Sequence, residues 1–228
     1  MQISIDTSTD TAGLAITENG WILTELTWNC GKNHSIQLLP NLNFLLEQNT
    51  LSLESADCII VARGPGSYNG LRVGISTARG LAYSLGIPIV GISTLEVEAW
   101  QHAGTGLPIR PILNAGREEV ATTLYQITDD GWTQLEDEHL STVDDLCSTI
   151  QTKTIFCGEY VFTITDELKA KLGDKADLIS PVANRRRPGF LAELGLKRID
   201  VKDYDDIASL QPNYFRGPSI TKPKLSTG

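Results

Sequence analysis

The pattern of apolar and polar residues along the chain predicts an α/β protein in which one order of elements occurs twice. Strands are expected where apolar residues alternate with polar ones or form a short continuous run, and helices where apolar residues recur at steps of three or four. In the first half, strands are expected near residues 3–5, 14–16, 21–26, 58–62 and 87–90, and helices over 35–48, 67–85 and 95–103. In the second half, strands are expected near 109–113, 120–127, 132–135 and 154–157, and helices over 143–150 and 166–172.

The order of elements in each half, βββαβα, resembles the duplicated ribonuclease-H-like architecture of the actin, sugar kinase and Hsp70 group (ASKHA). A break at Gly104-Thr105-Gly106-Leu107-Pro108 separates the halves. We therefore expect an N-terminal lobe over 1–103 and a C-terminal lobe over 107–216. Residues 217–228 contain Pro, Ser, Thr, Lys and Gly with little to bury, which predicts a flexible tail.

A glycine-rich turn, Gly64-Pro65-Gly66-Ser67, leads into the expected helix over 67–85. It does not have the dinucleotide spacing Gly-x-Gly-x-x-Gly, because Asn69 stands at the third glycine position, and it lacks the lysine of a phosphate-binding loop. The helix that follows carries one stripe of very small side chains: Gly70, Gly74, Ala78 and Ala82. Such a stripe permits close approach of another backbone, either the chain's own sheet or the helix of a partner.

Composition narrows the range of functions. The formal net charge of −9 and the pI of about 4.8 argue against a chain that grips a nucleic-acid backbone by itself. The only basic run, Arg185-Arg186-Arg187, is more typical of a solvated loop than of a binding site. No apolar run approaches the roughly 18 residues that span a bilayer, and the chain opens directly into a strand, so we expect a cytoplasmic protein without membrane attachment. The four cysteines show no C-x-x-C spacing and are expected to be buried free thiols: Cys30, Cys58, Cys147 and Cys157.

Several short motifs are similar to those of the TsaB (YeaZ) family. They are Ile5-Asp6-Thr7-Ser8, His34-Ser35 with Leu38-Leu39-Pro40, Gly64-Pro65-Gly66-Ser67 with Gly70-Leu71-Arg72-Val73-Gly74, Gly91-Ile92-Ser93-Thr94-Leu95, and Pro212-Asn213-Tyr214-Phe215-Arg216. The resemblance covers most of residues 1–100 and is thinner in the second half.

The resemblance implies a non-catalytic accessory subunit of the machinery that makes N6-threonylcarbamoyladenosine (t6A) at position 37 of tRNAs reading codons that start with A. In that family TsaD carries the catalysis, TsaE is an ATPase, and TsaC or its relative makes the activated donor. The partner TsaD is expected to bind the N-lobe helices, and the same surface is expected to form a homodimer when TsaD is absent. The expected interface residues are Leu38, Leu42, Leu45, Gly70, Leu71, Gly74 and Ala78. ATP or ADP, TsaE and tRNA would be bound only in the assembled complex.

The resemblance also implies that this chain has no catalytic residue and no metal site. The catalytic paralogue TsaD carries a His-x-x-x-His pair, and Thr94 and Glu98 stand at those places here, which is a poor donor set for a transition metal. Asn114 replaces the aspartate that the family commonly has at the start of the second lobe, which weakens any case for nucleotide hydrolysis. The alternative is a stand-alone nucleotide-binding phosphotransferase of the same fold, in which Asp6-Thr7-Ser8 would contact magnesium and phosphate. A plain interaction protein with some other partner is a third reading.

Overall fold

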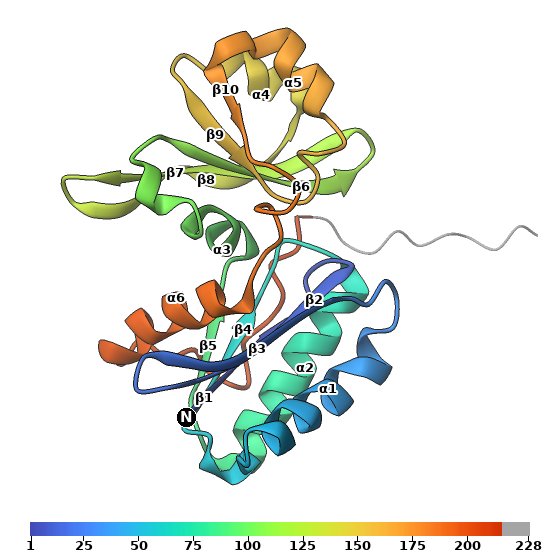
Figure 1. Cartoon of the computed structure of the whole chain (residues 1–228), viewed down its shortest axis with the longest axis vertical. Helices are drawn as coiled ribbons and strands as arrows, with labels where there is room; N and C mark the ends of the chain where they lie inside the picture. Colours follow the sequence, from blue (N-terminus) through green and yellow to red (C-terminus); the bar gives the residue numbers. More distant parts are fainter. Residues whose placement is uncertain (216–228) are drawn as a thin grey trace, which may run out of the picture.

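Two five-stranded mixed sheets, one in each lobe, form the framework of the computed structural model, which describes residues 1–215 (Figure 1). The first sheet has the order β3-β2-β1-β4-β5 and consists of β1 (Gln2–Asp6), β2 (Thr11–Glu18), β3 (Trp21–Asn29), β4 (Cys58–Ala62) and β5 (Ile89–Ile92). The second has the order β10-β9-β6-β7-β8 and consists of β6 (Ile109–Gly116), β7 (Glu119–Thr128), β8 (Gly131–Thr142), β9 (Thr154–Cys157) and β10 (Ala176–Leu178).

The two sheets repeat one topology. In each, the first three strands form an antiparallel meander, and the fourth and fifth strands add in parallel beside the first. The predicted duplicated α/β fold is therefore confirmed. The sequence pattern did not reveal β10, because a strand of three half-buried residues has too few positions to show a period.

The helices connect the strands in the same order in both lobes. They are α1 (His34–Gln48), α2 (Tyr68–Leu85), α3 (Thr94–Trp100), α4 (Val143–Thr149), α5 (Thr165–Leu172) and α6 (Pro188–Asp200), with short 3-10 turns at Leu53–Ser55, Ala103–Thr105 and Gly173–Lys175. Ser67 caps α2 by accepting a hydrogen bond from the Gly70 amide at 3.3 Å, and Gly86 ends it in the left-handed conformation at φ 66°. Both ends of α2 thus confirm the prediction.

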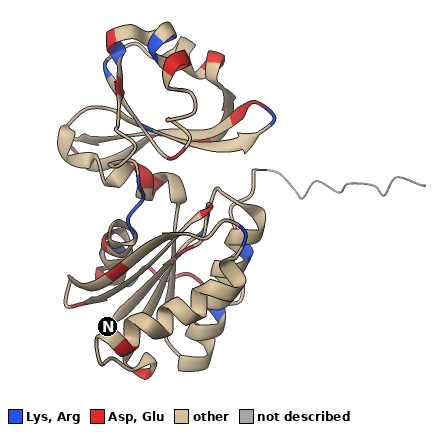
Figure 2. Cartoon of the chain, turned by 45° about the vertical axis from the view of Figure 1, so that its right-hand side comes forward, with Lys and Arg blue, Asp and Glu red and all other residues tan. Residues whose placement is uncertain are grey.

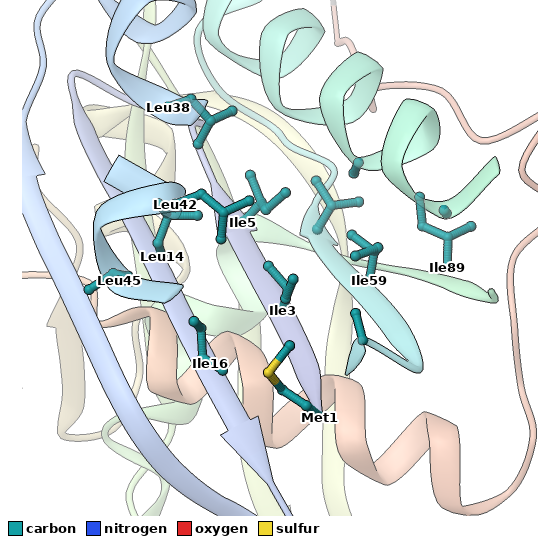
Figure 3. Close-up of a cluster of buried hydrophobic side chains, with 14 of the residues drawn as sticks. Met1, Ile3, Ile5, Leu14, Ile16, Leu38, Leu42, Leu45, Ile59 and Ile89 are labelled. Atoms are coloured by element: carbon teal, nitrogen blue, oxygen red, sulfur yellow. The ribbon is translucent and has the colours of Figure 1, made fainter. Parts of the chain in front are cut away.

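The main core lies between the first sheet and the pair α1 and α2. Figure 3 shows Leu38, Leu42 and Leu45 of α1 close to the isoleucines of β1 and β2. A second core lies between the other sheet and the pair α4 and α5. The four cysteines are buried free thiols, as predicted. Among residues 1–215, no helix is both long and apolar enough to cross a membrane.

The last helix of each lobe packs on the sheet of the other lobe. From α3, Leu95 packs with Leu113 and Ala121 of the second sheet, and Ala99 joins a cluster there as well. In exchange, α6 returns to the first sheet, where Leu191 and Leu194 join a cluster with residues of β4 and β5. In Figure 1, α3 lies below the upper sheet and α6 lies beside the lower one.

This exchange corrects the predicted domain boundaries. A boundary near residues 104–106 does separate the two sheets, but the expected C-terminal lobe over 107–216 contains a helix that belongs to the first core. The segment after α6 also returns, because Leu210 packs in the first core. Residues 216–228, for which a flexible tail was predicted, lie outside the described residues.

Candidate functional site

A cleft of about 310 Å³ opens between the lobes where the first strands of the two sheets end. Its walls come from the β1–β2 turn, the glycine-rich turn, the end of β6 and the loop after β9. We call it the interlobe cleft, and its lining residues are Thr9, Asp10, Gly66, Ser67, Leu113, Asn114, Glu159 and Tyr160.

The three residues predicted to contact a nucleotide lie beneath this cleft, not on its surface. Asp6, Thr7 and Ser8 are at most 4% exposed. One carboxylate oxygen of Asp6 accepts hydrogen bonds from the amide and the hydroxyl of Ser8, at 2.9 and 2.6 Å. Thr7 donates its hydroxyl hydrogen to the Gly70 carbonyl at 2.7 Å. Each of these side chains is already hydrogen-bonded inside the fold, and the phosphate contact stays a prediction.

Arg186 is the partner that holds Asp6. Its Nε donates to Asp6 Oδ2 at 2.5 Å, and its Nη1 donates to Glu98 Oε1 at 2.5 Å. Its Nη2 donates to the hydroxyls of Ser8 and Thr9 at 3.0 and 3.1 Å. Together with Glu159, whose carboxylate lies 3.9 Å from Nη1, these residues form what we call the Arg186 cluster.

The prediction of a solvated loop for the arginine run is wrong at its middle residue. Arg186 is 2% exposed, whereas Arg185 and Arg187 are exposed. Arg187 pairs with Glu25 of β3. Nothing in the local sequence marks Arg186, because its partners lie up to 180 residues away in the chain.

Burial and neighbouring charges have opposite effects on the pKa values of the residues in the cluster. Burial raises the pKa of Glu98 to about 7, against the opposing effect of Arg186, and Glu98 Oε2 has no hydrogen-bond partner. Burial would also raise the pKa of Asp6, but the guanidinium and the hydrogen bonds from Ser8 hold it below its ordinary value. The pKa of Arg186 is raised by Asp6 and Glu98 despite the desolvation that opposes it. Asp6 and Arg186 thus form a permanent ion pair, and Glu98 takes up a proton near neutral pH.

The two residues that replace the histidine pair of TsaD, Thr94 and Glu98, are both completely buried on α3. Across residues 1–215, no group of three His, Cys, Asp or Glu side chains could hold a metal ion. Asn114 lies on the cleft wall, and its side-chain oxygen accepts a hydrogen bond from the Gly116 amide at 2.8 Å.

The predicted partner-binding stripe faces the interior. A Cβ at Gly74 would overlap the Thr7 hydroxyl, and one at Gly70 would overlap the Thr7 carbonyl. The two alternatives for the stripe are therefore resolved in favour of the chain's own fold. All seven residues proposed for the interface are buried: Leu38, Leu42, Leu45, Gly70, Leu71, Gly74 and Ala78. Their assignment as a contact surface for another protein is wrong for the folded chain.

The opposite side of the same two helices has the properties expected of a contact surface. On α1, Ile36, Leu39 and Phe44 are 68, 47 and 52% exposed. Glu47 is the only charged residue of α1, which Figure 2 shows almost without charge. We call this side of the pair the outer face.

The outer face of α2 carries its own stripe of small residues. Ser76, Gly80 and Ser84 are exposed at four-residue spacing, and a Cβ at Gly80 would meet nothing within 4 Å. A full helical projection of both helices would have found this face, because apolar residues occur all around α1.

These elements define a two-lobed α/β protein of the actin-like class. A solved Pseudomonas aeruginosa protein described as similar to peptidase YEAZ matches with a TM-score of 0.80 and 21% identity, covering 94% of this chain and 99% of that one. YeaZ from the same organism matches with a TM-score of 0.78 and 19% identity, covering 93% and 99%.

Sequence comparison identifies the family. The family model "TsaD: tRNA N6-adenosine threonylcarbamoyltransferase" matches residues 28–180. The tRNA threonylcarbamoyladenosine biosynthesis protein TsaB of Bacillus subtilis is 31% identical over 94% of this chain and 93% of its own length. TsaB of Escherichia coli is 31% identical over 57% of this chain and 56% of its own length. The chain belongs to the TsaB family, as its motifs indicated.

Proposed function

We propose that this protein is a non-catalytic accessory subunit of t6A biosynthesis that binds and activates TsaD for modification of adenosine 37 in tRNAs reading codons that start with A. Family membership supports the pathway, because the curated relatives are named for it. The observation that carries the role as a subunit is the outer face, where α1 exposes the apolar side chains of Ile36, Leu39 and Phe44 and α2 exposes a stripe of small residues. Large apolar side chains exposed together on one element are a feature of protein–protein contact surfaces.

The outer face suits a partner built on the same fold. The TsaD family model matches residues 28–180, a span that contains both α1 and α2, which supports a pairing of equivalent helices in the two proteins. Ser76, Gly80 and Ser84 would allow a helix to approach the α2 backbone closely, and Ile36, Leu39 and Phe44 of α1 would supply apolar contact. In the absence of TsaD, the same face is available for self-pairing into a homodimer.

The buried Arg186 cluster supports a non-catalytic role. A phosphotransferase of this fold would need a carboxylate free to bind magnesium and phosphate, and Asp6 is committed to Arg186 and Ser8. TsaE, ATP or ADP, and tRNA would then be bound in the assembled complex and not by this chain alone. The net charge of −9 fits that division, because a phosphate backbone is bound by clustered Lys and Arg.

Charge placed on the outer face tests this proposal. Leu39→Glu and Phe44→Glu should each abolish co-purification with TsaD, because either would bury an unpaired carboxylate in the interface. Phe162→Glu is the matched control, since Phe162 is 69% exposed on the second lobe and should leave binding unchanged. Circular dichroism would verify that all three variants fold. Undiminished TsaD binding by both α1 variants would contradict the proposed interface.

A further inference from the structure

We propose that Arg186 is the resident cation of the interlobe cleft. Its guanidinium binds Asp6 and Ser8, the residues that the phosphotransferase alternative needs for magnesium and phosphate, and it locks the two lobes together. The cleft consequently takes no nucleoside phosphate. This inference concerns the cleft and does not depend on the proposed contact with TsaD.

Four hydrogen bonds within the fold and an ion pair with Glu159 engage all three nitrogens of the guanidinium. Nε is used by Asp6, Nη1 is shared between Glu98 and Glu159, and Nη2 is used by the hydroxyls of Ser8 and Thr9. An arginine offers five N–H groups in a fixed fork and cannot lose its charge at any physiological pH. The charge of Arg186 therefore stays beside Asp6 permanently, whereas a bound metal ion exchanges with solvent.

The cleft above the cluster has the wrong charge for a phosphate. None of its eight lining residues is Lys or Arg, whereas Asp10 and Glu159 contribute carboxylates. An incoming phosphate would face these acids without a counter-charge. Magnesium would reach Asp6 only by displacing a guanidinium held at 2.5 Å.

The same contacts connect the two lobes. Arg186 lies in the segment that leads from the second lobe to α6. Its partners come from β1 and the following turn of the first lobe, from α3, and from the loop after β9. Asn184 anchors this segment to the second lobe by accepting from the Gly158 amide and donating to the Ile179 carbonyl, both at 2.9 Å. The cluster therefore fixes the lobes at the point where the two exchanged helices meet.

Chemical rescue of Arg186→Ala provides the test, with Arg185→Ala as the matched control. Breaking a buried pair should lower the Tm of Arg186→Ala by roughly 10 °C, whereas the exposed Arg185 should change it by no more than about 2 °C. Millimolar methylguanidinium should restore part of the lost Tm in Arg186→Ala alone, because it returns a planar cation to the cavity. N-methylurea, which has a similar shape without charge, should not. Calorimetry of the wild type with Mg·ATP should show no binding.

Three results would overturn the inference. They are an Arg186→Ala protein as stable as Arg185→Ala, equal rescue by methylurea and methylguanidinium, and micromolar binding of Mg·ATP by the wild type. If Arg186→Ala does not fold, Arg186→Lys replaces it, since one ammonium cannot reach both carboxylates and both hydroxyls. Hydrogen exchange at the Gly158 amide should then be faster in Arg186→Lys than in the wild type. Unchanged exchange together with an unchanged Tm would also refute the claim that Arg186 holds the two lobes together.

Discussion

Two glycines on opposite sides of α2 should respond in opposite directions to the same substitution. Gly74 faces Thr7 in the interior, and Gly80 faces solvent with nothing within 4 Å of an added Cβ. Both lie within the helix, so alanine gains intrinsic helix propensity of about 1 kcal/mol at either position. At Gly80 nothing opposes this gain, and Gly80→Ala should stabilise the protein by 0.5 to about 1 kcal/mol.

At Gly74 the added methyl group would overlap the Thr7 hydroxyl, which donates to the Gly70 carbonyl at 2.7 Å. Moving Thr7 aside costs about 1–3 kcal/mol of overpacking, and losing its buried hydrogen bond costs about 1 kcal/mol more. After subtraction of the propensity gain, Gly74→Ala should destabilise the protein by roughly 1–3 kcal/mol.

Equilibrium unfolding in urea measures both effects. The midpoint should fall for Gly74→Ala and rise for Gly80→Ala at an unchanged slope, because neither variant alters the surface exposed on unfolding. A Gly74→Ala protein as stable as the wild type would refute the inward orientation of the stripe and reopen it as a contact surface. A bulky Gly80→Trp variant should remain folded yet lose TsaD, which separates stability from the proposed binding.

Two further predictions concern the interior. Because burial raises the pKa of Glu98 from 4.5 to about 7, the folded state binds the extra proton, so stability should fall by up to ~3 kcal/mol as pH rises from 4.5 through 7. Glu98→Gln should flatten that part of the pH profile of Tm, and a profile identical to that of the wild type would contradict the assignment. The lowered pKa of Asp6 has the opposite effect on stability, and this effect is confined to acidic pH. Gly195→Val should lower stability by about 1–3 kcal/mol, because a Cβ at Gly195 meets the side chain of Ile60, and thermal melting should show one transition for both lobes. Two separate transitions would mean that the exchanged helices do not couple the lobes.

The elements of this fold were largely predictable because their signals are local. The caps at Ser67 and Gly86 and the apolar run Cys58–Ala62 each lie within a few residues of the element that they mark. The duplicated sheet topology followed from the order of those elements.

The site was much less predictable because it depends on contacts between distant segments. Periodicity identified the small-residue stripe and the leucines of α1, but it does not say whether a face meets the chain's own sheet or another protein. The burial and ion pairing of Asp6 could not be predicted for the same reason. Its partner Arg186 belongs to a run of three arginines, and the composition of that run predicts a solvated loop. The helix α6 was not among the predicted elements, and its packing on the first sheet depends on contacts with segments far away in the chain.

The exchange of α3 and α6 has a consequence for synthesis on the ribosome. When the first five strands have emerged, the face of β4 and β5 that α6 covers is still exposed, because Leu191 and Leu194 are made more than 95 residues after Ile92. The first lobe therefore cannot complete its folding until α6 has been synthesised. Until that moment the nascent chain presents an apolar sheet surface, which is the kind of segment that chaperones bind and that aggregates when they are scarce.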